Sequence, residues 1–289
     1  MVGPARTEAD SRYGVTVTPR GVFSRPLGAA GLSREVARSI HRTINLIRLE
    51  LRQTSFGLYF GNLWLLLEPA LQAGTYYFLL KVVFGVGGAD ASFSFFFTAV
   101  TFWRSHATLV SAAPYFLAVK GHHYVEQGFG LSIALLEVVA NEILLLLVRV
   151  AVLLCFLVLA GYTPIWTWPL VVLVAAVQLS FSMALYVWLS MLGVLVKDIG
   201  KFVGHVVWLW WYLSPGLYSI HRIPDWAAVV YSLNPFAHLI PAYHSLLLKG
   251  AISQSAVLGL LAILVVSVLM LWLGLMQMRR FSYSMARYI

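Results

Sequence analysis

The sequence predicts an all-α integral membrane protein with six transmembrane helices, and two observations support this fold class. Hydrophobic residues make up 60% of the chain and charged residues only 11%, whereas a soluble domain carries about 25% charged residues. Six apolar stretches are also near or above the roughly 20 residues that a helix needs to cross about 30 Å of hydrocarbon. These stretches cover residues 58–84, 93–115, 129–160, 167–195, 202–219 and 254–278.

The N-terminal region divides into two parts ahead of the first apolar stretch. Residues 1–32 contain Gly, Pro and charges of both signs, which indicates a flexible cytoplasmic tail. Residues 33–54 predict an amphipathic helix, because at 100° per residue the aliphatic side chains fall within an arc of roughly 80° and the arginines cluster on the other side. We expect this helix to lie in the membrane interface, with its guanidinium groups among anionic headgroups. A solvated helix packed on a cytoplasmic partner is the alternative, and the two interpretations are compatible.

The distribution of basic residues predicts the orientation of the spans. Nine arginines precede residue 54, and three more follow residue 278. By the positive-inside rule both termini are therefore expected in the cytoplasm. The segments expected outside contain only Arg222 and Lys249 as basic residues. The net charge of +9 is thus mainly an orientation effect, and no nucleic-acid partner is expected.

The region 197–250 is apolar but interrupted by proline and glycine. A charged turn leads into an aromatic helix that is broken at residues 214–216, and Asn234-Pro235 and Pro241 interrupt the apolar run that follows. Broken helices at membrane depth persist only where protein or a water-filled cavity satisfies their backbone groups. We therefore expect broken, re-entrant half-helices between helices five and six that line a pathway, as in transport proteins.

The chain lacks the signatures of ATP binding, metal binding and covalent catalysis. It has no G-x-x-x-x-G-K-[ST] phosphate loop, no metal-ligand spacing among its eight His, and no set of nucleophile, base and orienting acid. If transport is driven by ATP, the ATPase is therefore a separate polypeptide that docks on the cytoplasmic face. The candidate docking surface is the polar connection 115–130, for which an ordinary polar loop is the alternative. Its candidate ATPase-coupling residues are Lys120, His122, His123 and Glu126.

Three groups of short motifs lie in order between residues 34 and 280. They are Leu49-Glu50-Leu51-Arg52 with Ser55-Phe56-Gly57 and the run from Leu63 to Pro69; Phe102-Trp103; and Lys197-Asp198-Ile199 with Leu213-Ser214-Pro215 and Leu233-Asn234-Pro235-Phe236. In this order they resemble the permease subunits of ABC-2 type polysaccharide exporters, which move lipid-linked O-antigen, teichoic acid and galactan chains outward. The chain departs from that pattern at Glu68, where the family commonly has Gln, and at Arg104, where an apolar residue is usual.

The resemblance implies an assembly, a domain and a cargo. It implies a homodimer of permeases in the bacterial plasma membrane with two copies of a separate ABC ATPase, which would hold ATP and magnesium, so that this chain needs no cofactor. Residues 55–280 would form the ABC-2 type transmembrane domain and residues 281–289 a cytoplasmic tail. The polymer would cross through a channel at the dimer interface. The excess of Arg over Lys, fifteen against five, together with abundant Ala, Val and Gly, indicates a GC-rich actinobacterial coding sequence, and the chain resembles mycobacterial galactan exporter permeases. That resemblance implies a polyprenyl-pyrophosphate-linked galactan or an O-antigen-like chain.

Aromatic side chains are the candidate lining of such a channel. A sugar ring has apolar C–H faces, so a sliding polymer suits aromatic surfaces that bind without a fixed hydrogen-bond register. Trp208, Trp211 and Tyr212 share one helical face, and Tyr59 and Tyr76 lie on the first span. The alternative is an interfacial aromatic belt, which many membrane proteins have.

Charged residues within the spans are further candidates, because their burial in a membrane is costly. Arg104 is expected to pair with Glu137 or Glu142, to fix the helix register, to gate the channel entrance or to contact the pyrophosphate of a lipid carrier. Arg48 and Arg52 are predicted to bind the pyrophosphate headgroup of the lipid carrier. They lie at the cytoplasmic interface, and a guanidinium group binds phosphate bidentately.

Two other classes of protein are compatible with the apolar composition. A membrane enzyme acting on lipid-linked sugars should cluster carboxylates or His at one membrane face, whereas Asp90, Asp198 and Asp225 are scattered. A proton-coupled secondary transporter would use the intramembrane glutamates as a relay but would usually show an internal repeat. A Walker-type ATPase encoded beside this chain would favour the exporter over both.

Overall fold

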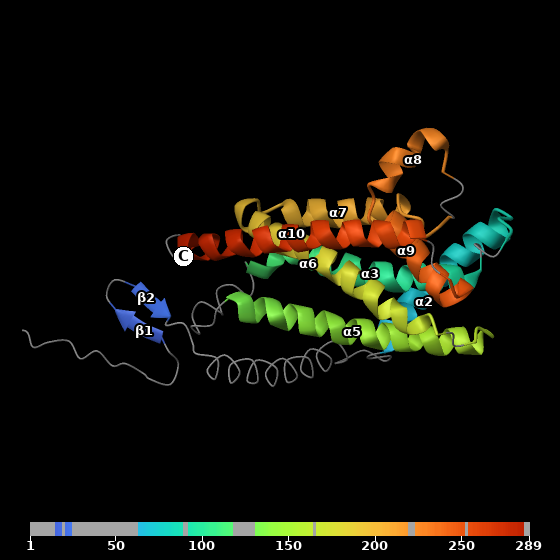
Figure 1. The fold of residues 1–289 in the computed structure, drawn as a ribbon, viewed down its shortest axis with the longest axis horizontal. Coiled ribbons are helices and arrows are strands. Elements are labelled where there is room, and N and C mark those ends of the chain that lie inside the picture. The colour runs from blue at the N-terminus through green and yellow to red at the C-terminus, as the bar shows by residue number, and fades with distance from the viewer. Residues whose placement is uncertain are drawn as a thin grey trace, which may run out of the picture.

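A computed structural model describes residues 15–18, 21–24, 63–88, 92–117, 131–163, 166–218, 223–251 and 254–285. They form a bundle of long helices, with shorter helices near the end opposite the C-terminus and a small hairpin at the other (Figure 1). The predicted interfacial helix at 33–54 and most of the predicted ATPase-docking connection lie outside the described residues.

A two-stranded antiparallel hairpin occurs in the region predicted to be a flexible tail. Strand β1 (Val15–Thr18) pairs with β2 (Gly21–Ser24), and Val15 lies opposite Ser24. The β-branched sequence of β1 favours a strand, and this signal lies within the region 1–32 that was predicted to be a flexible tail. A lone two-stranded hairpin is marginal in water, and the rest of the described chain is helical, as predicted.

In the described residues, six helical segments precede the broken region, in the predicted order. They are α2 (Trp64–Tyr77), the π-helical η2 (Phe78–Val83), α3 (Phe93–Phe116), α5 (Leu131–Leu159), the 3-10 turn η5 (Trp168–Leu170) and α6 (Val171–Leu195). Ser92 caps the start of α3, because its hydroxyl oxygen accepts a hydrogen bond from the backbone N–H of Phe95 at 3.2 Å.

The broken region contains short helices where the sequence predicts interruptions. Its segments, followed by the final helix, are α7 (Ile199–Tyr212), α8 (Asp225–Ser232), α9 (Phe236–His244), the π-helical η7 (Ser245–Lys249) and α10 (Gln254–Met285). Helix α7 ends just before the predicted break at residue 214, and α8 and α9 are separated at Asn234 and Pro235. A re-entrant course of α8 and α9 through the membrane stays a prediction.

Three helical segments of the described chain are long and apolar enough to cross a membrane, namely Ala134–Leu159, Trp168–Leu195 and Gln254–Met278. The other three predicted spans correspond to α2 with η2, to α3 and to α7. Helices α2 and α7 have only 14 residues each. Helix α3 has 24 residues but includes Arg104 and His106, and its neighbours enclose most of its side chains. A crossing by all six segments therefore stays a prediction.

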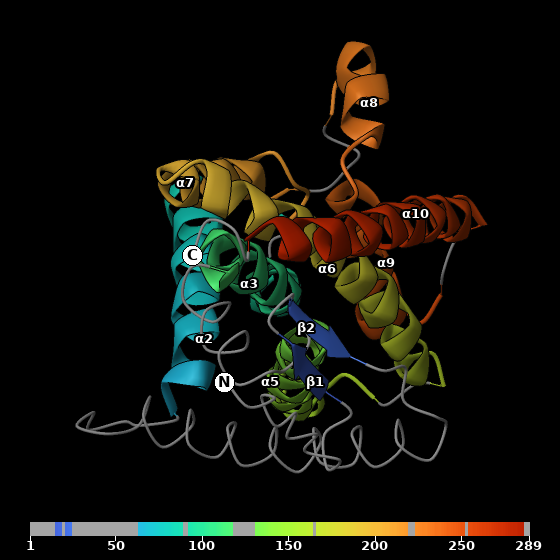
Figure 2. The same cartoon turned by 90° about the vertical axis from the view of Figure 1, so that its left-hand side faces the viewer.

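Helix α3 lies at the centre of the bundle. It packs against α2, α6, α7 and α9, and α6 packs in turn against α10 (Figure 2). The ring of Phe102 on α3 stacks on Tyr243 of α9, with 3.5 Å between ring centroids. The backbones of α3 and α6 are also close together, since a Cβ added to Gly193 would lie 1.9 Å from the carbonyl oxygen of Pro114. Only glycine allows two helix backbones to approach this closely.

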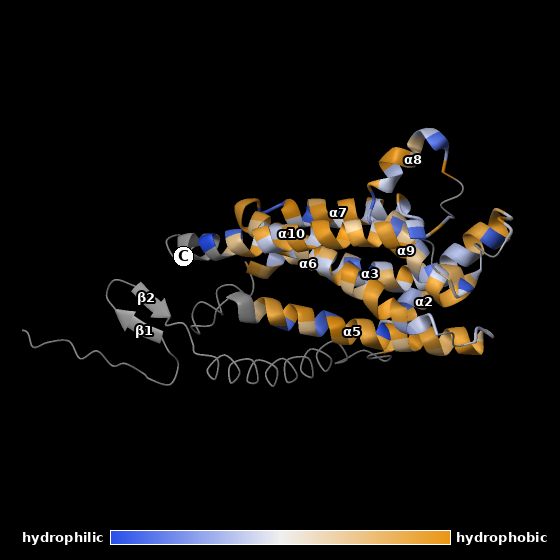
Figure 3. Ribbon diagram, viewed as in Figure 1, coloured by the Kyte–Doolittle hydropathy of each residue, from blue (hydrophilic) through white to orange (hydrophobic). Residues whose placement is uncertain are grey.

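The outer surfaces of α5 and α10 are apolar (Figure 3). Leu147 and Leu159 on α5 and Leu258 and Trp272 on α10 are each more than half exposed. So large an apolar surface is unfavourable in water. It suits contact with lipid acyl chains, which need no polar partner.

Side chains at the start of the η5 turn satisfy backbone groups in the π-helical segment η7. The hydroxyl of Thr167 donates to the carbonyl oxygen of Leu246 at 2.8 Å, and the indole N–H of Trp168 donates to that of Leu247 at 3.3 Å. The segment ends at Gly250, whose φ of 72° lies in the left-handed region that glycine adopts without strain. These contacts meet the requirement that interrupted helices in a membrane find partners within the protein.

Candidate functional site

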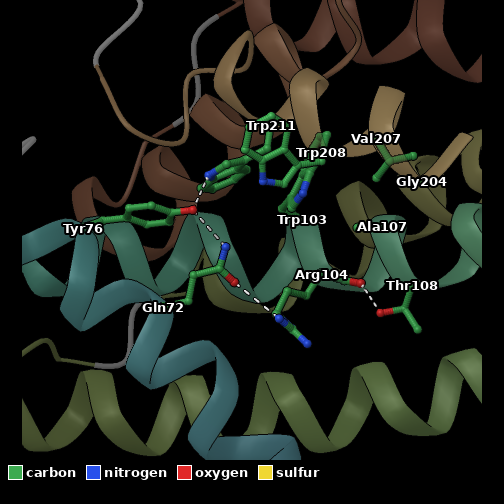
Figure 4. Close-up of a pocket in the computed structure, with 10 residues that line it drawn as sticks. All are labelled: Gln72, Tyr76, Trp103, Arg104, Ala107, Thr108, Gly204, Val207, Trp208 and Trp211. Carbon is green, nitrogen blue, oxygen red and sulfur yellow. Dashed lines mark hydrogen bonds between the residues drawn. The ribbon is translucent and has the colours of Figure 1, made fainter. Parts of the chain in front are cut away.

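A cavity of about 250 Å³ lies between α2, α3 and α7 (Figure 4). Four aromatic side chains and one guanidinium group dominate its lining, with small and polar residues between them. The lining residues are Gln72, Tyr76, Trp103, Arg104, Ala107, Thr108, Gly204, Val207, Trp208 and Trp211. Helices that are distant in the sequence thus build a single site.

Two buried indoles form the back of the cavity. Trp103 is 4% exposed and Trp211 only 2%. The indole N–H of Trp211 donates to the hydroxyl oxygen of Tyr76 at 2.8 Å, and the amide of Gln72 donates to the same oxygen at 3.0 Å. The rings of Tyr76 and Trp211 also stack, with centroids 5.8 Å apart. These contacts hold the wall in a single arrangement across α2 and α7.

Trp208 presents an open aromatic face at the cavity. It is 59% exposed, and Tyr212 packs against its ring edge-on at a centroid distance of 5.0 Å. Of the predicted channel-lining residues, the structure therefore brings Trp208, Trp211 and Tyr76 together on one cavity, with Tyr212 behind Trp208. Tyr59 lies outside the described residues. A role of this group in lining a channel stays a prediction.

Arg104 forms an ion pair with Glu68 beside the cavity. Its guanidinium also donates a hydrogen bond to the side-chain oxygen of Gln72 at 3.4 Å (Figure 4). The side chain of Arg104 is 35% exposed and that of Glu68 is 49% exposed, so the pair is partly solvated. The expected pairing of Arg104 with Glu137 or Glu142 is wrong, because Arg104 faces α2 and those glutamates lie on α5.

The buried ion pair is formed within α5 instead. Arg149 donates to Glu142 at 3.0 Å, and both side chains are less than a tenth exposed. The hydroxyl of Ser105 on α3 donates to the same carboxylate oxygen, which ties α5 to the central helix. Glu137 is also buried on α5. A gating role for Arg104, Glu137 or Glu142 stays a prediction.

Asn234 connects the end of α7 to the start of α9, a role that the sequence did not predict for it. Its side-chain oxygen accepts hydrogen bonds from the indole N–H of Trp210 at 2.9 Å and from the backbone N–H of Phe236 at 3.0 Å. Its amide nitrogen donates to the carbonyl oxygen of Leu213 at 3.0 Å and to the hydroxyl of Ser214 at 3.2 Å. An Asn before a Pro that opens a helix is the signal that could have predicted this capping role.

His106 is a second residue that the sequence analysis missed. It is fully buried, and its Nδ1 lies 2.8 Å from the hydroxyl oxygen of Ser182. The rings of Phe181, Trp210 and Phe236 surround it, with centroids 4.6 to 5.8 Å away. A His in the centre of an aromatic helix was the available signal. The cluster joins α3, α6, α7 and α9 directly behind the cavity.

Several predicted site residues lie outside the described residues. They are the headgroup candidates Arg48 and Arg52 and the ATPase-coupling candidates Lys120, His122, His123 and Glu126. Within the described ranges, no group of three or more His, Cys, Asp or Glu could hold a metal ion.

The site lies within the part of the chain that is similar to known proteins. The sequence matches the family described as ABC-2 type transporter over residues 45–248. The O-antigen export system permease protein RfbA of Myxococcus xanthus is 26% identical over 243 residues, which cover 83% of this chain and 92% of that protein. Two proteins of the same name from Klebsiella pneumoniae are 26% and 27% identical over 196 and 195 residues, each covering 67% of this chain and 75% and 74% of the relative. The family match includes every residue that lines the cavity.

Proposed function

This chain belongs to the ABC-2 type transporter family, and from that membership we propose that it is the permease subunit of an ATP-driven exporter of a lipid-linked polysaccharide. As a member of the family it is an integral membrane transport subunit and not an enzyme. Three relatives are named as O-antigen export permeases, and they are similar to it over most of its length. Their names support a polysaccharide as the cargo.

The observation that favours a sugar polymer within this chain is the cavity between α2, α3 and α7. Its walls combine aromatic faces with a guanidinium group and an amide. Sugar rings present apolar C–H faces and polar hydroxyl edges, so both kinds of surface have a partner on a glycan. An acyl chain has no polar group that could pair with Arg104. A small ion has no apolar surface that could pack against four aromatic rings.

The energy source would be a separate subunit. We propose that two permease copies form a homodimer, that two copies of an ABC ATPase bind ATP and magnesium, and that they dock on the cytoplasmic face. Lys120, His122, His123 and Glu126 would make the docking contacts. Both termini would lie in the cytoplasm of a bacterial cell, with the permease in its inner membrane.

The cargo would enter with its lipid headgroup at the cytoplasmic interface. Arg48 and Arg52 would bind the pyrophosphate of a polyprenyl carrier, because guanidinium groups bind phosphate oxygens bidentately. The glycan would then pass through a channel at the permease dimer interface, lined by residues such as Trp208 and Tyr76. We propose a galactan or an O-antigen-like chain as the polymer, and hence a role in building the cell wall or cell surface.

Mass spectrometry of proteins and lipids on the tagged chain, purified in native lipid from its own host, tests this function. We expect a stoichiometric ATPase with Walker motifs together with a polyprenyl-linked glycan, both absent from a control purification of an unrelated tagged membrane protein. If the chain is purified with neither after gentle extraction, the exporter assignment is wrong. A secondary transporter or a membrane enzyme would then be favoured.

A further inference from the structure

One side chain in the lining of the cavity is charged, which a purely aromatic passage would not need: Arg104, whose partner Glu68 lies beside the cavity. Arg104 and Glu68 are paired, yet the side chains of both remain partly exposed, and Trp208 lines the same cavity as Arg104. We propose that the cavity is a binding subsite for one neutral sugar unit, with Trp208 as the stacking platform and the Arg104–Glu68 pair as the hydrogen-bonding edge. This inference rests on the proposed function, since it concerns the glycan that an exporter would carry.

The size of the cavity fits a single sugar unit. Its volume of about 250 Å³ is just below the range of roughly 300–1,000 Å³ that is usual for drug-sized ligands. One ring of a polymer can therefore enter while its neighbours remain outside. A side cavity of this size would contact successive units of a passing chain one at a time.

The aromatic part of the subsite is rigid on one side and open on the other. Trp211 is held by its hydrogen bond to Tyr76 and does not need a ligand to fix its position. Trp208 is 59% exposed, and Tyr212 packs edge-on against its ring, which leaves a face available. An exposed indole face beside a fixed wall is suited to the apolar face of a sugar ring.

The polar part of the subsite offers both donors and acceptors. A guanidinium group has five N–H donors, and those of Arg104 also contact Glu68 and Gln72. Glu68 has a carboxylate that is 49% exposed and can accept from a hydroxyl. A sugar hydroxyl both donates and accepts, so neighbouring hydroxyls on a ring can bind to the two partners of the ion pair at once.

The charge of the subsite selects for a neutral sugar. Arg104 is the charged residue in the lining of the cavity, and Glu68 neutralises it. A uronic acid would bring its carboxylate close to that of Glu68, and like charges at short range repel each other. Removing the charge of Glu68 alone would leave Arg104 as an unpaired cation and would make the same site favour an acidic sugar.

Binding of two matched probes to the full chain in lipid nanodiscs tests the proposal. The probes are α-(1→4)-linked galactotetraose and α-(1→4)-linked tetragalacturonate, which differ in the oxidation of C6, and the readout is the Kd of each from isothermal titration calorimetry. We expect the wild type to bind galactotetraose more tightly. Glu68→Gln should shift the ratio of the two Kd values by about tenfold in favour of tetragalacturonate. A tenfold change in Kd corresponds to the contribution of about one charge-assisted hydrogen bond.

Two further variants separate stacking from charge. Trp208→Ala should weaken the binding of both probes about fivefold, as expected for loss of an aromatic contact, without changing their ratio. Trp226→Ala is the matched control, because Trp226 is 85% exposed on α8 and does not line the cavity. It should leave both Kd values unchanged, and the thermal midpoint of each variant checks that the fold is intact.

The outcomes distinguish this proposal from the function on which it rests. If Glu68→Gln leaves the Kd ratio unchanged, or if Trp208→Ala binds both probes like the wild type, the proposal of a sugar subsite is wrong. This holds even where an ATPase and a glycan are purified with the chain. If neither the ATPase nor the glycan is purified with the chain but the Kd ratio shifts as expected, the cavity binds sugars and the exporter assignment is wrong.

Discussion

Asn234 makes four hydrogen bonds at the junction between α7 and α9. We predict that Asn234→Ala lowers the free energy of unfolding by about 3 kcal/mol, because it leaves the N–H of Trp210 and Phe236 and the carbonyl of Leu213 without this partner. Denaturant titration of the purified chain in mixed micelles measures the change. Asn234→Asp keeps the accepting oxygen and loses the donor, so an intermediate effect is expected. A change within about 0.5 kcal/mol for Asn234→Ala would contradict the capping role.

The buried pair of Glu142 and Arg149 should behave differently from the exposed pair beside the cavity. Arg149→Met leaves a buried carboxylate uncompensated, and we predict a loss of about 3–5 kcal/mol in the free energy of unfolding. Adding Glu142→Gln to that variant should recover most of the loss. Arg104→Met breaks a partly solvated pair and should cost about 1 kcal/mol or less. Equal losses for Arg149→Met and Arg104→Met would show that burial is not the cause.

The individual residues of the site could be predicted from the sequence only in part. The spacing of Trp208 and Trp211 placed both on one helical face, and the structure has both at the cavity. The partner of Arg104 could not be derived in this way, because it depends on how α3 is rotated relative to α2 and α5. The contact of Asn234 with Phe236 is local, whereas its contacts with Trp210, Leu213 and Ser214 join segments 20 to 24 residues apart in the sequence, and no local pattern encodes these.

At the scale of elements, the crossing of α3 and α6 depends on a single glycine. We predict that Gly193→Ala lowers the free energy of unfolding by about 2 kcal/mol, because the added Cβ would collide with the backbone of Pro114 and force the helices apart. Gly204→Ala on α7 is the matched control. Its Cβ would meet no atom within 4 Å, so it should stabilise the helix by about 0.5–1 kcal/mol. The same titration checks both variants, and effects of the same sign would contradict the close packing at Gly193.

The sequence predicts helices well where apolar length alone defines them. The predicted stretches 93–115 and 167–195 agree with α3 and with η5 and α6 to about one residue. The stretch 202–219 is less accurate, because α7 begins at Ile199 in the charged turn and ends at Tyr212. Hydropathy does not report a turn or a cap, and the β1–β2 hairpin has too few residues to give a periodic signal. Short elements thus depend on individual turn and capping residues, and their signal is lost when hydropathy is averaged over a window of residues.

At the scale of the whole molecule, the proposed function predicts that variants of the site export less glycan. We predict that Trp208→Ala and Arg52→Ala each lower the amount of glycan that reaches the cell surface several-fold without dissociating the assembly, because under the proposed function the first removes a stacking face and the second a phosphate ligand. Surface glycan measured by lectin or antibody binding, with size-exclusion chromatography of the complex, checks this. Trp226→Ala should export normally. Normal export by both Trp208→Ala and Arg52→Ala would contradict the assignment of the channel and headgroup sites.

Any transport cycle requires parts of the protein to move against one another, and the contact between Gly193 and Pro114 restricts where that motion can occur. Two backbones in direct contact cannot slide or roll without collision, whereas helices that meet through long side chains can shift when those side chains change rotamer. Helices α3 and α6 therefore act as a rigid frame. The aromatic wall that α7 and α2 contribute to the cavity is attached to that frame through side chains, so it can shift as a unit relative to the frame when those side chains change rotamer.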